Sequence, residues 1–214
     1  MKLYKHIIWD WNGTLLDDIN ISLNAINCIL KKRNRKLINY SFHEKKFCFP
    51  IKDYYKKLLL PTDDYNFSLL CHEFTQEYNK NWKNTKLQEK AEFVLNKIKS
   101  KKNSQSILSA QEITQLNKFI DYYKIKKYFI KIVGLNNNKA EGKVESGKKL
   151  ISDLKILTND ILLIGDTNYD YSLAKELGVD CILFYSGHQS KNILLKTSTE
   201  IIDSLEDLLD FLKK

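Results

Sequence analysis

The chain is poor in several residue types that mark specialised classes of protein. Its 214 residues include seven glycines and two prolines, and a hydrophobic share of 43% is enough for a folded core. Disordered, collagen-like and low-complexity classes are therefore excluded. No apolar run approaches the roughly 20 residues that cross a bilayer. The apolar stretch near the start is too short for a signal peptide and ends at Asp10.

Cysteine is also sparse and carries no metal or disulfide signature. The four cysteines include no CxxC pair, which argues against a zinc knuckle or a disulfide framework; they are Cys28, Cys48, Cys71 and Cys181. This pattern favours a reducing compartment, and we expect a cytoplasmic protein.

Arginine is nearly absent, although the chain carries 35 Lys plus Arg against 26 Asp plus Glu and a formal charge of +9. Only Arg33 and Arg35 offer the planar fork that usually reads phosphates and bases. The densest basic clusters, 31–36 and 97–102, fall where helices are expected to end, and lysine there complements the helix dipole. We therefore expect neither a nucleic-acid nor a membrane partner, but a small molecule bound by a monomer or homodimer.

The glycines and the apolar pattern divide the chain. After Gly13 the next glycine is Gly134. Short β-branched runs predict strands at 6–10, 106–109, 129–133, 161–165 and 181–185, with 200–203 as a short edge strand. Three- and four-residue spacing predicts helices at 89–101, 111–123, 143–156, 168–177 and 204–213. This alternation indicates an α/β fold with a parallel sheet and helices on both faces.

Residues 17–87 break this alternation. They contain no glycine, hold both prolines and show helical spacing, with a helix expected at 52–59 between Pro50 and Pro61. We predict an all-helical insert at 17–87, and a core formed by 1–16 and 88–214.

Carboxylates follow two of the predicted strands. Strand 6–10 ends in Asp10, and strand 161–165 is followed by Asp166, with Asp170 one helical turn later. Ligands of an open parallel sheet bind beyond the carboxyl ends of its strands. Carboxylates gathered there without histidine or cysteine suit a hard ion, Mg²⁺ above all.

At this point the sequence resembles the haloacid dehalogenase superfamily, whose members are mostly Mg²⁺-dependent phosphatases with a Rossmann-like core and a mobile cap. Four ordered motifs carry the resemblance: 10–15 (DWNGTL), 107–110 (ILSA), Lys143 and 165–170 (GDTNYD). The helical insert matches a cap placed directly after the first motif. The overall look is of the small phosphoglycolate-phosphatase-like members.

The resemblance implies a role for each motif residue. Asp10 would attack phosphorus, Ser109 and the backbone of Ala110 would hold phosphoryl oxygens, and Lys143 would supply positive charge. The catalytic set is Asp10, Asn12, Ser109 and Lys143; the substrate-binding set is Gly13, Thr14, Ala110 and Lys52; the metal-binding set is Asp10, Asn12, Asp166 and Asp170. The implied function is hydrolysis of a small phosphorylated metabolite through an aspartyl-phosphate. Asp170 has a simpler alternative, a surface acid in a first helical turn.

Asn12 departs from the family pattern. Family phosphatases usually carry an aspartate two residues after the nucleophile, which protonates the leaving oxygen, and an amide cannot do this. Losing a general acid typically costs about 10²–10⁴ in rate. The leaving group then needs no acid, or the proton comes from elsewhere, or the chain is a weak or inactive scaffold that acts as a basic binding module. The main-chain carbonyl of Asn12 could still bind Mg²⁺.

Lys52 opens a second enzymatic interpretation. In the phosphonoacetaldehyde hydrolase branch the position of Asn12 is also not acidic, and a cap lysine forms a Schiff base before the C–P bond is cleaved. Lys52 is the candidate, with a solvated lysine or a guide for an anionic substrate as alternatives. We interpret Asp17 and Asp18 as helix caps, and His188 as a substrate contact or a turn residue.

Overall fold

The structure is a computed structural model that describes residues 3–101, 103–140 and 142–212. Within these residues six parallel strands form one sheet in the order β5-β4-β1-β6-β7-β8. Counted along this sheet alone, that is the 3-2-1-4-5-6 order of the Rossmann fold. The strands are β1 (His6–Trp9), β4 (Ser104–Glu112), β5 (Lys131–Leu135), β6 (Ile161–Gly165), β7 (Asp180–Phe184) and β8 (Glu200–Ile202).

Helices cover both faces of this sheet, because successive residues of a strand point to opposite faces. In β1, Ile7 and Trp9 pack with α5, α6 and α10, whereas Ile8 packs with α7 and α8. Among the described residues, no helix is both long and apolar enough to cross a membrane. The bounds are α5 (Ala91–Ser100), α6 (Ile113–Tyr122), α7 (Val144–Leu154), α8 (Asn168–Leu177), α9 (Lys191–Leu194) and α10 (Asp207–Phe211), with 3-10 turns η2 (Lys126–Tyr128) and η3 (Thr158–Asp160).

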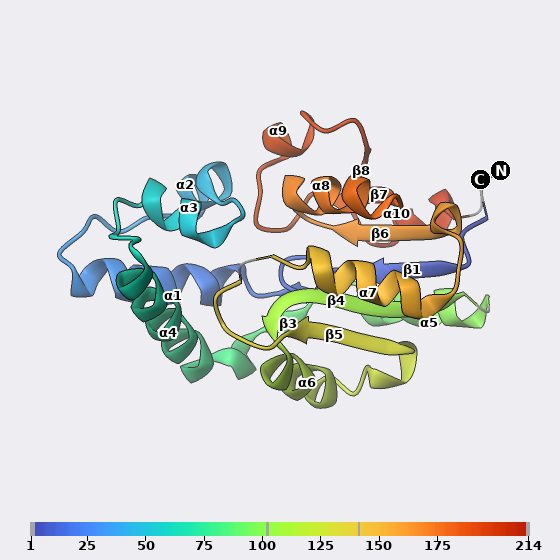
Figure 1. The fold of residues 1–214 in the computed structure, drawn as a ribbon, viewed down its shortest axis with the longest axis horizontal. Coiled ribbons are helices and arrows are strands. Elements are labelled where there is room, and N and C mark those ends of the chain that lie inside the picture. Colours follow the sequence, from blue (N-terminus) through green and yellow to red (C-terminus); the bar gives the residue numbers. More distant parts are fainter. Residues whose placement is uncertain (1–2, 102, 141, 213–214) are drawn as a thin grey trace.

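The remaining helices gather beyond the end of the sheet toward which its strands point (Figure 1). They enclose an apolar cluster of their own, to which Leu30, Tyr55 and Leu70 contribute. The bounds are α1 (Ile19–Lys32), α2 (Tyr40–Lys46), α3 (Ile51–Lys57) and α4 (Asp64–Lys80), followed by the 3-10 turn η1 (Trp82–Asn84). We call α1–α4 the cap. A cluster separate from the sheet is what the proposed division at 17–87 requires.

The fold class is confirmed, but three local predictions need correction. The insert is not all-helical, because β2 (Leu16–Asp17) pairs with β3 (Lys86–Leu87) as an antiparallel ribbon where the chain enters and leaves the cap. Strand β4 extends on both sides of the predicted 106–109. Helix α3 ends at Lys57 instead of residue 59, because Leu59 takes a left-handed conformation with φ of 58°.

Candidate active site

The sheet register brings the motif residues to one rim. Trp9 of β1 pairs with Ile107 of β4 on one side and Ile164 of β6 on the other. Asp10, Ser109 and Asp166 follow these partners by one or two residues, so all three lie at the same level of the sheet, just beyond the carboxyl ends of β1 and β6; β4 continues past this level to Glu112. The strand order reverses between β1 and β6, the position where open α/β sheets bind ligands.

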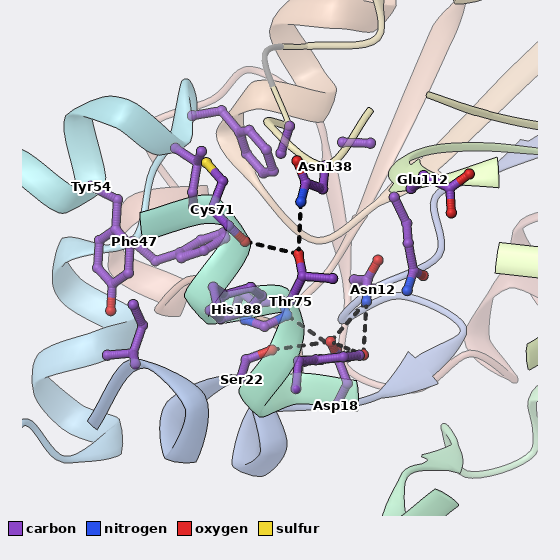
Figure 2. Close-up of a pocket in the computed structure, with 18 of the residues that line it drawn as sticks. Asn12, Asp18, Ser22, Phe47, Tyr54, Cys71, Thr75, Glu112, Asn138 and His188 are labelled. Carbon is purple, nitrogen blue, oxygen red and sulfur yellow. Dashed lines mark hydrogen bonds and ion pairs between the residues drawn. The ribbon is translucent and has the colours of Figure 1, made fainter. Parts of the chain in front are cut away.

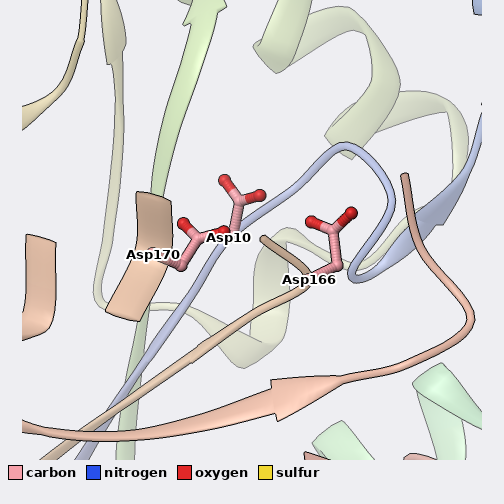
Figure 3. A group of neighbouring side chains, drawn as sticks. All are labelled: Asp10, Asp166 and Asp170. Atoms are coloured by element: carbon pink, nitrogen blue, oxygen red, sulfur yellow. The ribbon is translucent and has the colours of Figure 1, made fainter. Parts of the chain in front are cut away.

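Three carboxylates from separate segments meet at this rim. The candidate ligand atoms of Asp10, Asp166 and Asp170 all lie within 4.8 Å of one another (Figure 3). Lys143, which immediately precedes α7, is only 3% exposed and places its Nζ 2.5 Å from Asp10 Oδ1 and 2.9 Å from Asp170 Oδ1. Its Nζ also donates to the Leu108 carbonyl at 3.3 Å. The structure thus brings together the predicted acids and the predicted lysine.

Burial and mutual repulsion shape the electrostatics of this cluster. Burial raises the pKa of Asp10 to about 6 against the opposing charge of Lys143. Burial also raises the pKa of Asp166 to about 8, with His188 opposing the shift and the neighbouring Asp10 and Asp170 adding to it. Burial disfavours the charged form of Lys143, but Asp10 and Asp170 raise its pKa above the ordinary value. Three carboxylates thus share one lysine, and a cation added among them would favour their charged forms.

Asp166 is closely packed by the loops that contain Gly13 and Gly187. Its carboxylate accepts hydrogen bonds from Thr14 Oγ1 at 3.1 Å and from the His188 amide at 2.6 Å. A Cβ added at Gly13 would lie 2.4 Å from Asp166 Oδ2, and one added at Gly187 would lie 2.2 Å from the same oxygen. Gly13 also has φ of 77°, which a side chain disfavours. Thr14 and Gly13 therefore contact Asp166, and the Gly13 amide donates to Leu16 and Asp18.

The remaining motif residues lie around the cluster. Ser109 is buried and its hydroxyl accepts from the Gln111 amide at 3.0 Å, so its own proton remains to be donated. Asp170 is 1% exposed, which excludes the surface-acid alternative. Its Oδ2 accepts from the Thr167 amide and hydroxyl in a capping box at the start of α8, while Oδ1 faces Lys143. Asp170 therefore fixes Lys143 as well as facing the proposed metal site.

Asp18 is a buried hub that joins the core to the cap, and the prediction of a helix-capping side chain was wrong. It precedes α1 but makes no capping hydrogen bond. Its carboxylate instead accepts from five donors, all within 3.2 Å: Asn12 Nδ2, the Gly13 amide, Ser22 Oγ, Tyr78 OH and His188 Nε2. Figure 2 shows Asn12, Ser22 and His188 around Asp18. Neighbouring Asp17 is partly exposed and lies 3.6 Å from Lys86.

Two histidines extend this hub into the cap, and no motif or spacing in the sequence singles out His43. His188 Nδ1 lies 3.1 Å from His43 Nε2, and His43 Nδ1 lies 2.8 Å from the Tyr54 hydroxyl. Burial opposes a charge on His188, but Asp18 and Asp166 raise its pKa to about 9, whereas burial and the nearby His188 lower the pKa of His43 to about 3. A charged His188 therefore donates to a neutral His43, which donates to Tyr54.

Lys52 lies apart from these residues. It is on α3, where its Nζ contacts Asp64 Oδ1 at 3.0 Å and sits 5.4 Å from the centre of the Phe67 ring. It does not line the cavity between core and cap, whereas Asn12 and Ala110 do. The structure thus separates Lys52 from the other predicted site residues.

Comparison with known proteins extends along the whole chain. The model of the family described as haloacid dehalogenase-like hydrolase matches residues 7–184. A predicted phosphatase from Clostridium acetobutylicum superposes with a TM-score of 0.86 at 20% identity, over 99% of this chain and 100% of that one. A haloacid dehalogenase-like family hydrolase from Streptococcus pneumoniae gives 0.83 at 18% identity, over 99% of each chain. A predicted phosphoglycolate phosphatase from Haemophilus somnus gives 0.79 at 17% identity, over 97% of each. No curated protein matches the chain.

Proposed function

We propose that this protein is a phosphatase, because the chain belongs to the haloacid dehalogenase-like hydrolases. In this proposal the protein hydrolyses a small phosphorylated metabolite with Mg²⁺ and an aspartyl-phosphate at Asp10. The observation that carries it is the rim cluster, in which three carboxylates lie within 4.8 Å of one another and two of them, Asp10 and Asp170, contact the buried Lys143. The phosphatase descriptions of the similar structures point to the same reaction class.

Mg²⁺ fits the donor set of this rim. Asp10, Asp166 and Asp170 offer oxygen ligands, which Mg²⁺ prefers. Burial, with repulsion between the carboxylates added, raises the pKa of Asp10 and of Asp166, and a bound cation would favour their charged forms. The main-chain carbonyl of Asn12 is a further candidate ligand. When bound, Mg²⁺ would neutralise the repulsion between a carboxylate nucleophile and an anionic phosphate.

The chain's own residues perform the remaining tasks. Lys143 holds Asp10 ionised and oriented through the 2.5 Å contact, and Ser109 can donate its hydroxyl proton to a phosphoryl oxygen. A carboxylate oxygen of Asp10 bonds to phosphorus while the ester P–O bond breaks, and the leaving oxygen keeps the electron pair and takes a proton. Water then attacks phosphorus, the bond to Asp10 breaks, and inorganic phosphate leaves with Asp10 regenerated. Positioning and electrostatics supply most of the acceleration.

The alternatives receive less support from the contacts. A Schiff base at Lys52 requires that side chain to face the substrate, but it pairs with Asp64 outside the cavity. For a basic binding module, lysines such as Lys31, Lys32, Lys97 and Lys99 lie in the last turns of α1 and α5, where they complement helix ends.

Replacing Asp10 by Asn tests the proposal. We expect Mg²⁺-dependent phosphate release to fall at least about 10³-fold, as for removal of a nucleophile. Acid quenching of wild-type turnover should also trap a protein heavier by one phosphoryl group, which Asp10→Asn cannot form. Asp153→Asn is the matched control, because Asp153 is a half-exposed partner of Lys131. Unchanged turnover in Asp10→Asn with a retained fold would contradict the assignment.

A further inference from the structure

The cavity between core and cap would hold the leaving group of the substrate, and the residues that line it limit the size and charge of that group. It has a volume of about 160 Å³ and begins at Asn12 and Ala110, the neighbours of the proposed catalytic residues. Figure 2 shows Phe47 and Tyr54 of the cap on one side and Asn12 and Glu112 of the core on the other. Much of the wall is aromatic or aliphatic, including Phe47, Phe49, Tyr54, Phe74 and Ile26. A leaving group that extends from a phosphate at the rim would occupy this space.

Among the described residues, the cavity lining offers no unpaired cation for a second anionic group: the charged His188 pairs with Asp18. None of the described residues that line it is a lysine or arginine, although the chain has 35 of them. His43 and His188 line it, but Asp18, each other and Tyr54 already occupy their ring nitrogens. Glu112 adds a carboxylate that accepts from two backbone amides of α6. A carboxylate or second phosphate on the leaving group would therefore lose hydration without gaining a cationic partner, although side chains such as Gln111 and Gln115 line the cavity.

The size of the cavity fits one ring. An apolar protein cavity of about 150 Å³ binds benzene, which is close to the 160 Å³ found here. Aromatic walls favour stacked or edge-on contact with such a ring. A neutral, single-ring leaving group thus matches the volume and the chemistry of the walls.

Asn12 points to the same class of leaving group. It stands where family phosphatases carry the acid that protonates the leaving oxygen, and its Nδ2 donates to Asp18 Oδ2 at 2.8 Å and to Tyr78 OH at 3.3 Å. A phenol, with a pKa of about 10 as in tyrosine, leaves as its anion far more readily than an alcohol whose acidity is near that of water, about 15.7. A phenolic leaving group explains how catalysis proceeds without an acid at this position.

Resting on the phosphatase function above, we propose that the substrate is a phosphate monoester of an uncharged single-ring phenol whose ring occupies this cavity. Its phosphorus bonds to Asp10 as the aryl P–O bond breaks. The phenolate keeps the electron pair and takes its proton from water. Hydrolysis of the aspartyl-phosphate then releases inorganic phosphate.

Three small substrates test the acidity and the charge of the leaving group separately. Phenyl phosphate and benzyl phosphate carry the same ring but differ in leaving-group acidity, and 2-phosphoglycolate carries a carboxylate. Initial rates of Mg²⁺-dependent phosphate release should give a kcat about 10²–10⁴-fold higher for phenyl than for benzyl phosphate, the range that a missing general acid costs. 2-Phosphoglycolate should have the lowest kcat/KM. Asn12→Asp should raise the kcat for benzyl phosphate by a larger factor than the kcat for phenyl phosphate, because only the alcohol leaving group needs an acid.

A pair of aromatic truncations tests the cavity itself. Phe49 lines it, whereas Tyr65 on α4 is 77% exposed. Phe49→Ala should raise KM for phenyl phosphate about two- to twelvefold, as expected for loss of one aromatic contact, and Tyr65→Ala should not change it. A preference for 2-phosphoglycolate or equal kcat for the two ring esters would overturn this inference alone. Release from none of the three, with Mg²⁺-dependent release from another phosphate monoester retained, would also overturn this inference alone. Absence of Mg²⁺-dependent release from every phosphate monoester tested would overturn the phosphatase function with it.

Discussion

Truncating Asp18 to Ala should destabilise the protein far more than truncating its neighbour Asp17. Both residues precede α1, and their sequence context is nearly identical. Asp18 is 1% exposed and accepts hydrogen bonds from five donors that belong to the first motif, the cap and the loop after β7. The side chain of Asp17 is 27% exposed and lies 3.6 Å from Lys86, whose own side chain is 79% exposed.

The contacts set the expected magnitudes. Asp18→Ala leaves a buried His188 charge and several buried donors unpaired, and breaking a buried ion pair in this way costs about 3–5 kcal/mol. For a chain of this size each kcal/mol lowers Tm by about 2–4 °C, so Tm should fall by about 6–20 °C. Asp17→Ala removes one partly exposed ion pair, which contributes about 0–1 kcal/mol.

Urea unfolding at pH 7 followed by circular dichroism, with a thermal scan beside it, measures both variants. Since Asp18 bonds the cap to the core, the unfolding transition of Asp18→Ala should also become less cooperative. If both aspartates were helix caps, each truncation would cost a similar amount, about 0.5–2 kcal/mol. Equal losses in the two variants would therefore refute the hub and restore the capping interpretation.

Two further predictions concern buried ionisable groups. Burial lowers the pKa of His6 to about 4. As the pH falls below the ordinary histidine pKa of about 6.5, His6 therefore takes up a proton in the unfolded chain before it does so in the folded chain. The stability of wild type relative to His6→Gln should be fully present above about pH 6.5 and decrease by about 2–3 kcal/mol by pH 4.5; urea titrations at pH 7.5 and 4.5 that show a constant difference would contradict this. Mg²⁺ at about 100 times its Kd should stabilise the wild type by about 2.7 kcal/mol, which a thermal scan would show as a rise in Tm. Asp166→Asn should be at least as stable as the wild type without Mg²⁺, and its Tm should not rise when Mg²⁺ is added. A rise in Tm equal to that of the wild type would show that Asp166 is not part of the metal site.

Local sequence determined the core of the fold and the rim of the site. The alternation of β-branched runs with helical spacing placed the sheet strands and their main helices, because burial on a strand or helix repeats with a short period. Asp10 and Asp166 could be predicted because each stands at the end of a strand, and the parallel sheet brings such positions to one rim. Lys143 and Gly13 were predicted from the resemblance of their motifs to the superfamily. The structure supplies the reason for Gly13, since a Cβ there would lie 2.4 Å from Asp166 Oδ2.

Only the tertiary structure determined the contacts between core and cap and the cavity beside the active site. Asp18, His43 and His188 form one hydrogen-bonded chain although 145 residues separate the two histidines, and no local spacing encodes such a contact. The β2–β3 ribbon has two residues in each strand, too few for a period to show. Lys52 looked suited to the substrate until α3 placed it beside Asp64. The single-ring cavity, whose described lining holds no lysine or arginine, arises only where cap and core pack together, because its walls come from segments that are distant in sequence.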